Sequence, residues 1–159
     1  MSEDDKRNFI IQKIKDLKRL RIFQNMEERE IFEIMKRATL LNFEPGQKVF
    51  SEGDMDDSLF VIVHGNFEVV STSPNTGEKI SFFFAGEGLV FGEMSFLDSQ
   101  ARSATVIATA PSEVLKLTRT RYEELVEEVP KVSAKFMFGL AEILSRRLRG
   151  ANQRIKHSV

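Results

Sequence analysis

The fold is predicted best from the segment Phe91 to Val106, which reads FGEMSFLDSQARSATV. Its pattern predicts the end of a strand, a short turn of helix, a loop, and a new strand with Arg102 at its start. Gly92 has no side chain, so a ligand can approach the backbone closely there. Glu93 to Ser95 would begin the short helix, and the free N–H groups at a helix start favour an anion.

Two side chains of this segment indicate what kind of anion fits. Arg102 carries a planar, permanently charged guanidinium, which binds a phosphate through two hydrogen bonds. An ionised Glu93 can only accept hydrogen bonds, so it needs a hydroxyl donor such as those of a ribose. Together the two side chains predict one phosphate with a sugar hydroxyl beside it, and a cyclic nucleotide fits that description well.

The segment also resembles the phosphate-binding cassette of cyclic-nucleotide-binding domains. That cassette has the pattern F-G-E, a small residue two positions on, and then R-[S/T/A]-A. The residues that match it are Phe91, Gly92, Glu93, Ser95, Arg102, Ser103 and Ala104. The chain is similar in this respect to the catabolite activator protein sensor domain and to the regulatory subunit of cAMP-dependent protein kinase. The resemblance implies reversible binding of cAMP or cGMP, with no chemistry on the ligand.

The resemblance implies a role for each matching residue. Arg102 and the backbone N–H groups near Met94 and Ser95 would hold the cyclic phosphate, and Glu93 with the Gly92 backbone would take the ribose 2′-OH. Ser103 would add a hydroxyl to the phosphate or base, and Phe82 and Val69 would line the base. Phe96 would sense the inward movement of the cassette and pass it to the C-terminal helices. The expected ligand-binding residues are Phe91, Gly92, Glu93, Met94, Ser95, Arg102, Ser103, Ala104 and Phe82.

Hydrophobic periodicity predicts a mainly β fold with flanking helices. Residues 1–37 show helical spacing, with Asn25 and Glu28 as a capping box for a second helix. Residues 38–118 contain short strands separated by turn signals, which favour a double-stranded β-helix (jelly-roll) barrel. Residues 119–159 return to helical spacing and predict a long C-terminal helix. We expect the three segments to form one domain.

The long C-terminal helix carries an apolar stripe, with residues at three- and four-residue steps. Its members are Val132, Phe136, Leu140, Ile143, Leu144, Leu148, Ala151 and Ile155. The stripe is narrow enough to be the seam of a homodimer, and it could equally pack on the chain's own barrel. The same end of the chain is basic, through Arg146, Arg147, Arg149, Arg154 and Lys156. Cations suit a helix C-terminus, and an acidic partner is the alternative, while nucleic acid is not expected as a partner.

Composition excludes several other functions. The chain has 159 residues, a net charge of -1, and no cysteine. No apolar run reaches the ~20 residues of a membrane span, and the acidic N-terminus is unlike a secretory signal, so we expect a cytoplasmic protein. The acidic turn of Glu52, Asp54, Asp56 and Asp57 does not fit a calcium loop, and a solvated turn is expected there. His64 and His157 lie far apart in sequence, so neither a metal site nor an enzyme is predicted.

Some alternatives remain open at this stage. Ser103 does not decide between cAMP and cGMP, and cAMP is the preferred ligand. Leu89 stands where the family commonly has an acidic residue. The chain ends at Val159 without a helix-turn-helix, so we expect a stand-alone sensor that acts through a separate, unknown protein effector. A sensor fragment of a larger transcription regulator is one alternative, and a degenerate, ligand-free dimeric scaffold in which Arg102 pairs with Glu93 is another.

Overall fold

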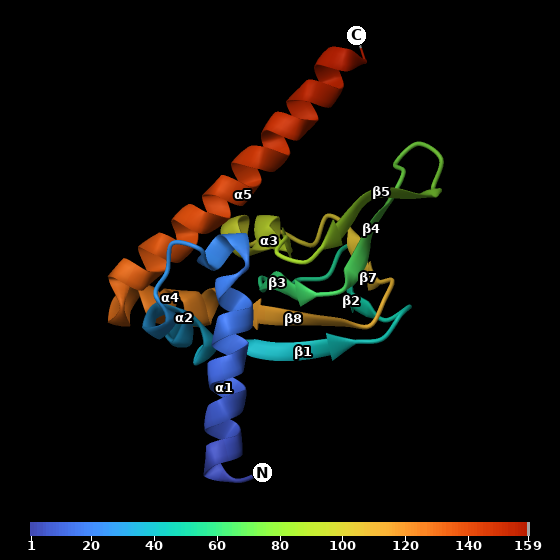
Figure 1. Cartoon of the computed structure of the whole chain (residues 1–159). Coiled ribbons are helices and arrows are strands. Elements are labelled where there is room, and N and C mark those ends of the chain that lie inside the picture. Colours follow the sequence, from blue (N-terminus) through green and yellow to red (C-terminus); the bar gives the residue numbers. More distant parts are fainter. Residues whose placement is uncertain (159) are drawn as a thin grey trace.

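The computed structural model describes residues 1–158, with the backbone alone at residues 82 and 83. The helices are α1 (Glu3–Lys18), the 3₁₀ turn η1 (Arg21–Phe23), α2 (Glu28–Met35), α3 (Glu93–Asp98), α4 (Arg119–Glu128) and α5 (Pro130–His157). The strands are β1 (Thr39–Phe43), β2 (Lys48–Phe50), β3 (Leu59–His64), β4 (Asn66–Thr72), β5 (Lys79–Gly86), β6 (Val90–Phe91), β7 (Thr105–Ala108) and β8 (Ser112–Leu117). Figure 1 shows the strands together in the middle, with helices on one side.

The strands form two four-stranded antiparallel sheets, in the orders β1-β8-β3-β6 and β2-β7-β4-β5. Neighbours that are distant in sequence pair in both sheets, for example Phe60 with Phe91 in one and Val69 with Val106 in the other. The fold prediction of a jelly-roll with flanking helices is therefore confirmed. The pairing of β3 with β6 places the start of the Phe91–Val106 segment at a sheet edge.

The first sheet is buried on both of its faces, as strand β3 illustrates. Phe60 and Ile62 point into the barrel, where they join Phe67 and Phe91 in one apolar cluster. The alternate residues of β3 point outward and pack under the helices in a second cluster. Because side chains alternate along a strand, such a strand needs an unbroken apolar run, and LFVIV supplies it.

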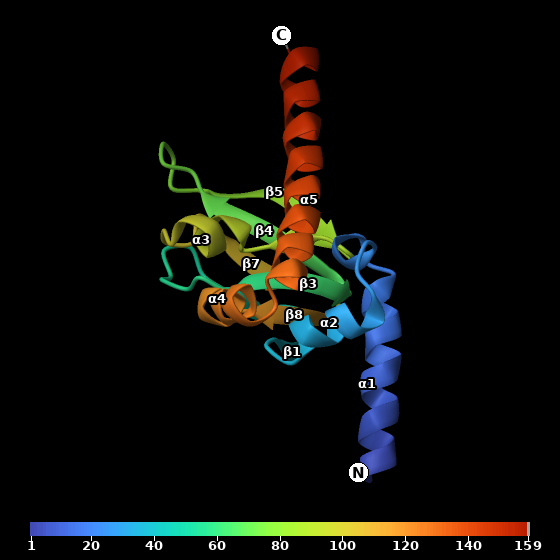
Figure 2. The same cartoon turned by 90° about the vertical axis from the view of Figure 1, so that its left-hand side faces the viewer.

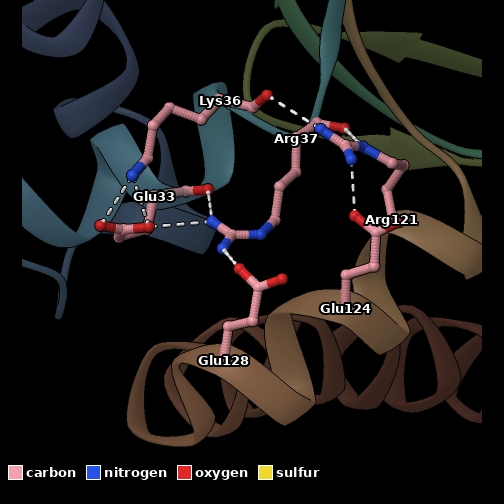
Figure 3. A network of polar contacts seen from close by, with 6 residues as sticks. All are labelled: Glu33, Lys36, Arg37, Arg121, Glu124 and Glu128. Carbon is pink, nitrogen blue, oxygen red and sulfur yellow. Dashed lines mark hydrogen bonds and ion pairs between the residues drawn. The ribbon is translucent and has the colours of Figure 1, made fainter.

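Helices α2 and α4 are joined by polar contacts at the edge of this second cluster (Figure 3). Arg37 donates to Glu33 at 2.8 Å and also pairs with Glu128 of α4. Arg121 of α4 donates to the backbone carbonyls of Lys36 and Arg37, at the C-terminal end of α2. Carbonyls at a helix end lack intrahelical partners, so these bonds fix α4 against α2.

The start of α2 differs from the predicted capping box. Glu27, rather than Asn25, is the N-cap residue: its side chain accepts a hydrogen bond from the Glu30 backbone N–H, and the Glu30 side chain accepts one from the Glu27 backbone N–H. Glu30 is buried, accepts a hydrogen bond from the Glu27 backbone at 2.9 Å, and pairs with Lys135 of α5 at 2.8 Å. The helix therefore begins two residues later than Asn25 would place it, and its first turn contains Glu30, whose carboxylate pairs with α5.

Helix α5 packs on the barrel over its first half and extends away from it over its second half, as both views show (Figures 1 and 2). Val132, Phe136, Leu140 and Ile143 are buried in the chain's own core. The alternative in which the stripe packs on its own barrel is therefore correct for these four residues. At Gly139 the helix touches η1 so closely that a Cβ would lie 2.6 Å from the Ile22 carbonyl oxygen.

Candidate functional site

A cavity of about 640 Å³ lies between the Phe91–Val106 segment and helix α5. Eight of the nine expected ligand-binding residues line it, namely Phe91, Gly92, Glu93, Met94, Ser95, Arg102, Ser103 and Ala104. Val69 lines it as well, as expected. The ninth residue, Phe82, has a side chain outside the described part of the structure.

Arg102 is buried, and its guanidinium is held on two sides. Its Nη1 donates to the Gly92 carbonyl at 2.9 Å, and its Nη2 donates to Asp56 Oδ2 and to the Ser58 carbonyl, both at 2.7 Å. The Phe50 ring stacks on it, with the guanidinium carbon 4.0 Å from the ring centroid. Its Nε–H is buried and has no acceptor among the described residues. A buried donor without an acceptor is costly, so an anion oxygen that reached this N–H would relieve that cost.

The backbone around Arg102 is fixed by the turn that precedes β3. The Arg102 N–H donates to the Asp54 carbonyl and the Gly53 N–H donates to the Arg102 carbonyl, each at 2.8 Å. Asp56, in the same turn, supplies the carboxylate that pairs with the guanidinium. The alternative in which Arg102 pairs with Glu93 is therefore not what the structure contains.

The carboxyl of Asp56 is tuned by these contacts. Burial raises its pKa, but the hydrogen bonds from Arg102 and Ser58, with the guanidinium charge, outweigh burial and leave the pKa below its ordinary value. Asp56 is thus ionised near neutral pH and neutralises part of the charge of Arg102. The interpretation of this acidic turn as merely solvated was wrong for Asp56.

Gly92 is required by the geometry of this site. It is the N-cap of α3 and has a φ of 78°, a left-handed conformation that favours glycine. A Cβ on Gly92 would lie 2.7 Å from Arg102 Nη1 and 2.8 Å from the Ser58 carbonyl oxygen. Glycine therefore permits both the turn into α3 and the contact with Arg102.

Glu93 is bound by helix α5 and not by its own segment. Arg147 Nη1 donates to Glu93 Oε1 at 2.8 Å, and Arg147 Nη2 donates to the Val90 carbonyl. The two side chains are 17% and 24% exposed, so the ion pair is mostly shielded from water. The outer oxygen of Glu93 retains acceptor capacity, because a carboxylate offers about four lone-pair sites.

Several residues of the site could not be identified from the sequence. Asp56 and Ser58 act on Arg102 from 46 and 44 residues away, and Arg147 reaches Glu93 across 54 residues. The basic run near the end of α5 was visible in the sequence, but nothing local indicated that it lines this cavity. Arg21, Arg146 and Arg154 also line the cavity, together with Phe50 and Ile143.

The structure gives no indication of a metal centre in its described part. Within residues 1–158, no group of three or more His, Cys, Asp or Glu side chains is arranged to hold a metal ion. His64 lies 3.8 Å from Glu113 on the surface, remote from the cavity lining. None of the described helices is both long enough and apolar enough to cross a membrane.

The family of the chain follows from comparison with known proteins. Residues 40–129, more than half of the chain, match the model of the Cyclic nucleotide-binding domain family. The chain therefore belongs to this family of ligand-binding domains, and the resemblance stated from the sequence is confirmed. The matched range includes the whole Phe91–Val106 segment.

Individual relatives agree with this assignment. The chain is 35% identical over 107 residues to the Cyclic AMP receptor protein of Thermus thermophilus, covering 67% of this chain and 47% of that protein. Among solved structures, a cyclic nucleotide-binding domain from Methylobacillus flagellatus matches with a TM-score of 0.83 and 24% identity, covering 96% of this chain and 85% of that one. The regulatory domain of Toxoplasma gondii PKA, solved with cAMP, matches with a TM-score of 0.72 and 19% identity, covering 88% of this chain and 52% of that one. The last two likenesses show the fold.

The chain spans less than two thirds of the length of the curated relatives that it matches first, including 47% of the Thermus thermophilus protein. Activities and partners of those longer proteins therefore do not transfer to this chain as findings.

Proposed function

We propose that this chain is a sensor that binds a cyclic nucleotide, cAMP in preference to cGMP, and relays binding to its C-terminal helices and to a protein effector. Arg102 and the first N–H groups of α3 hold the cyclic phosphate, and Glu93 and the Gly92 backbone take the ribose hydroxyl. Ser103 adds a hydroxyl at the phosphate or base. The 35% identity to a protein named for cyclic AMP supports cAMP. Residues 1–37, 38–118 and 119–159 act as one domain, and the ligand leaves chemically unchanged.

The observation that carries this proposal is the state of Arg102. A guanidinium that is 1% exposed, stacked on Phe50 and left with a buried unpartnered Nε–H is prepared for an anion. The cavity above it is lined by apolar side chains such as Val69, Leu89 and Val106, which suit a flat base. A solvated surface arginine would have none of these features.

Two contacts connect the site to the C-terminal helices and support the relay. Arg147 joins α5 to Glu93, the residue assigned to the ribose. Phe96 of α3 is buried and packs edge-on against Tyr122 of α4, with ring centroids 5.5 Å apart. A ligand that binds one arrangement of these contacts more tightly shifts the population toward it. Amide exchange in α5 that is identical with and without saturating cAMP would contradict the relay.

A homodimer is the second part of the proposal, and the exposed side of α5 supports it. Phe138, Leu148 and Ile155 are 64%, 64% and 61% exposed. Their spacing of ten and seven residues, with small or polar residues at 141, 145 and 152 between them, follows a heptad seam. The proposed seam therefore differs from the predicted stripe and shares only Leu148 and Ile155 with it.

Two further expectations, that nucleic acid is an unlikely partner and that the protein is cytoplasmic, stay predictions.

Isothermal titration calorimetry tests the binding proposal directly. We expect wild-type protein to bind cAMP more tightly than cGMP and 5′-AMP, with the nucleotide recovered intact afterwards. Arg102→Gln should weaken cAMP binding by about tenfold or more, because a charged hydrogen bond contributes about 1.5–3 kcal/mol. Arg149→Gln is the matched control, since Arg149 is exposed on α5 and does not line the cavity. A folded dimer that binds none of the three nucleotides would support the scaffold instead.

A further inference from the structure

The cavity has a second basic wall, opposite Arg102, that one cyclic phosphate does not use. Helix α5 contributes Arg146, Arg147 and Arg154 to the lining, and η1 contributes Arg21. Arg154 follows Arg146 and Arg147 by eight and seven residues, which is about two helical turns, so it lies on the same side of α5 as they do. Both views show α5 continuing past α3, so this wall belongs to the part of the helix that leaves the barrel (Figures 1 and 2).

Three of these arginines lack an acidic partner. Within residues 1–158, Arg21, Arg146 and Arg154 form no ion pair, whereas Arg147 pairs with Glu93. Glu142 of α5 precedes Arg146 by one turn but forms no ion pair with it within residues 1–158, and the sequence after Glu142 contains no Asp or Glu. Arg154 bends back over the cavity lining, because its Nη1 would lie 3.9 Å from a Cβ on Gly150.

The charge of the cavity exceeds that of a cyclic mononucleotide. Five arginines line it, and the carboxylates that face them are Glu93 in the lining and Asp56 beneath Arg102. The described site therefore carries three more positive than negative side chains, whereas cAMP brings a single negative charge. Arg102 accounts for one phosphate, and Arg146 and Arg154 remain available for another.

We propose that Arg146 and Arg154, supported by Arg21, form a second phosphate subsite, so that the cavity accepts a nucleotide with two phosphate groups. This inference rests on the proposed function, because Arg102 is taken to hold the first phosphate. Guanidinium groups bind phosphate oxygens in bidentate fashion, and the long side chains of two exposed arginines about two helical turns apart can converge on one phosphate. A volume of about 640 Å³ is ample for a ligand larger than one nucleotide. A cyclic dinucleotide and a linear nucleoside bisphosphate share this chemistry.

Calorimetry with three adenine ligands tests the subsite at one low salt concentration. The ligands are cAMP, cyclic di-AMP, and adenosine 3′,5′-bisphosphate, which carries two phosphates but no cyclic one. We expect cyclic di-AMP to bind at least about tenfold more tightly than cAMP, since the second phosphate gains charge-assisted hydrogen bonds. If adenosine 3′,5′-bisphosphate binds as tightly as cyclic di-AMP, the subsite accepts linear ligands. If it binds more weakly than cyclic di-AMP, the subsite is assigned to cyclic dinucleotides.

Variants of α5 then locate the second phosphate. Arg146→Gln with Arg154→Gln should lower the affinity for the favoured bisphosphate about tenfold or more and that for cAMP less than threefold. Arg146→Lys with Arg154→Lys should retain part of the affinity for the favoured two-phosphate ligand. Arg149→Gln should change neither that affinity nor the affinity for cAMP. The inference is wrong if cAMP binds at least as tightly as both bisphosphates, or if the double glutamine variant weakens all ligands equally.

The outcomes separate this inference from the proposed function. Binding of cAMP that depends on Arg102, without any advantage for a second phosphate, overturns the subsite and leaves the sensor intact. Binding of a bisphosphate that depends on Arg146 and Arg154, without any binding of cAMP, supports the subsite and overturns the cAMP assignment. Failure of all three ligands to bind overturns both.

Discussion

Replacing Asp56 by asparagine tests how Arg102 is held in the site. The substitution keeps the shape of the side chain and removes the carboxylate that lies 2.7 Å from Arg102 Nη2. A hydrogen bond to a charged group contributes about 1.5–3 kcal/mol, and the 33% exposure of Asp56 places the loss at the lower end, because solvent screens the pair. We therefore expect Asp56→Asn to lower the free energy of unfolding by about 2 kcal/mol. For a chain of this length, the melting temperature should fall by roughly 4–8 °C.

The pH dependence of this loss follows from the lowered pKa of Asp56. Hydrogen bonds hold the folded-state pKa below the ordinary value of 3.8, so the carboxylate stabilises the fold fully above that value. Its contribution is lost as the pH falls through the lowered folded-state pKa. Urea unfolding of wild type and Asp56→Asn should therefore differ at pH 7, begin to converge below about pH 3.8, and agree once the pH is below the folded-state pKa.

The same two proteins can be compared in saturating cAMP, which brings a negative charge to the site. In the variant, the cyclic phosphate replaces the missing negative charge beside Arg102, so the ligand should raise the melting temperature more in Asp56→Asn than in wild type. Asp57→Asn is the matched control, because this neighbour has no contact with Arg102. Equal unfolding free energies for Asp56→Asn and Asp57→Asn, within about 0.5 kcal/mol, would refute the assigned role of Asp56.

Three further substitutions test the packing of α5 and its neighbours. Gly139→Ala should lower the free energy of unfolding in urea by about 1–2 kcal/mol. The new Cβ would lie 2.6 Å from the Ile22 carbonyl oxygen, and this clash outweighs the gain of about 1 kcal/mol in helix propensity. A stabilised variant would contradict this contact. Glu30→Gln should lower the free energy of unfolding by about 1–2 kcal/mol above pH 4.5 and by less in acid. The reason is that the Glu27 backbone hydrogen bond and Lys135 lower the pKa of Glu30. A loss of stability that is independent of pH would exclude the carboxylate as its cause. Phe138→Glu should convert the proposed dimer to a folded monomer in sedimentation velocity, because Phe138 is 64% exposed in the single chain and belongs to the proposed seam. A dimer that persists in this variant would place the interface elsewhere.

The sequence predicted the strands and the cavity-facing segment well because both depend on local patterns. Strand β3 shows this, since its apolar run and the following His64-Gly65-Asn66 turn are contiguous in sequence. For Gly92 the sequence indicated only a close approach of a ligand to the backbone, whereas the structure shows a positive φ and a close contact with Arg102. The start of α2 was placed incorrectly because Glu27 caps the helix, although glutamate is not a preferred capping residue.

The partners of the site residues could not be predicted, because they come together only when the chain folds. Asp56 lies in a turn whose acidic residues are alike in sequence, and only the backbone hydrogen bonds of that turn with Arg102 bring Asp56 to the guanidinium. Arg147 is one of several basic residues near the end of α5, and the crossing of α5 over η1 at Gly139 decides that it reaches Glu93.

Helix α5 is thus attached to the rest of the chain at two different kinds of contact. Lys135 pairs with the buried Glu30, and Phe136, Leu140 and Ile143 bury their side chains in the core around it. Arg147 is about 18 Å further along the helix, at 1.5 Å per residue, where the apolar side chains Leu148 and Ile155 face solvent. A change in the bonding of Glu93 therefore acts on the half of α5 that has few other contacts with the barrel. Because Arg146 and Arg154 lie on that same half together with Leu148 and Ile155, the proposed ligand charge and the proposed dimer seam would act on a single helix.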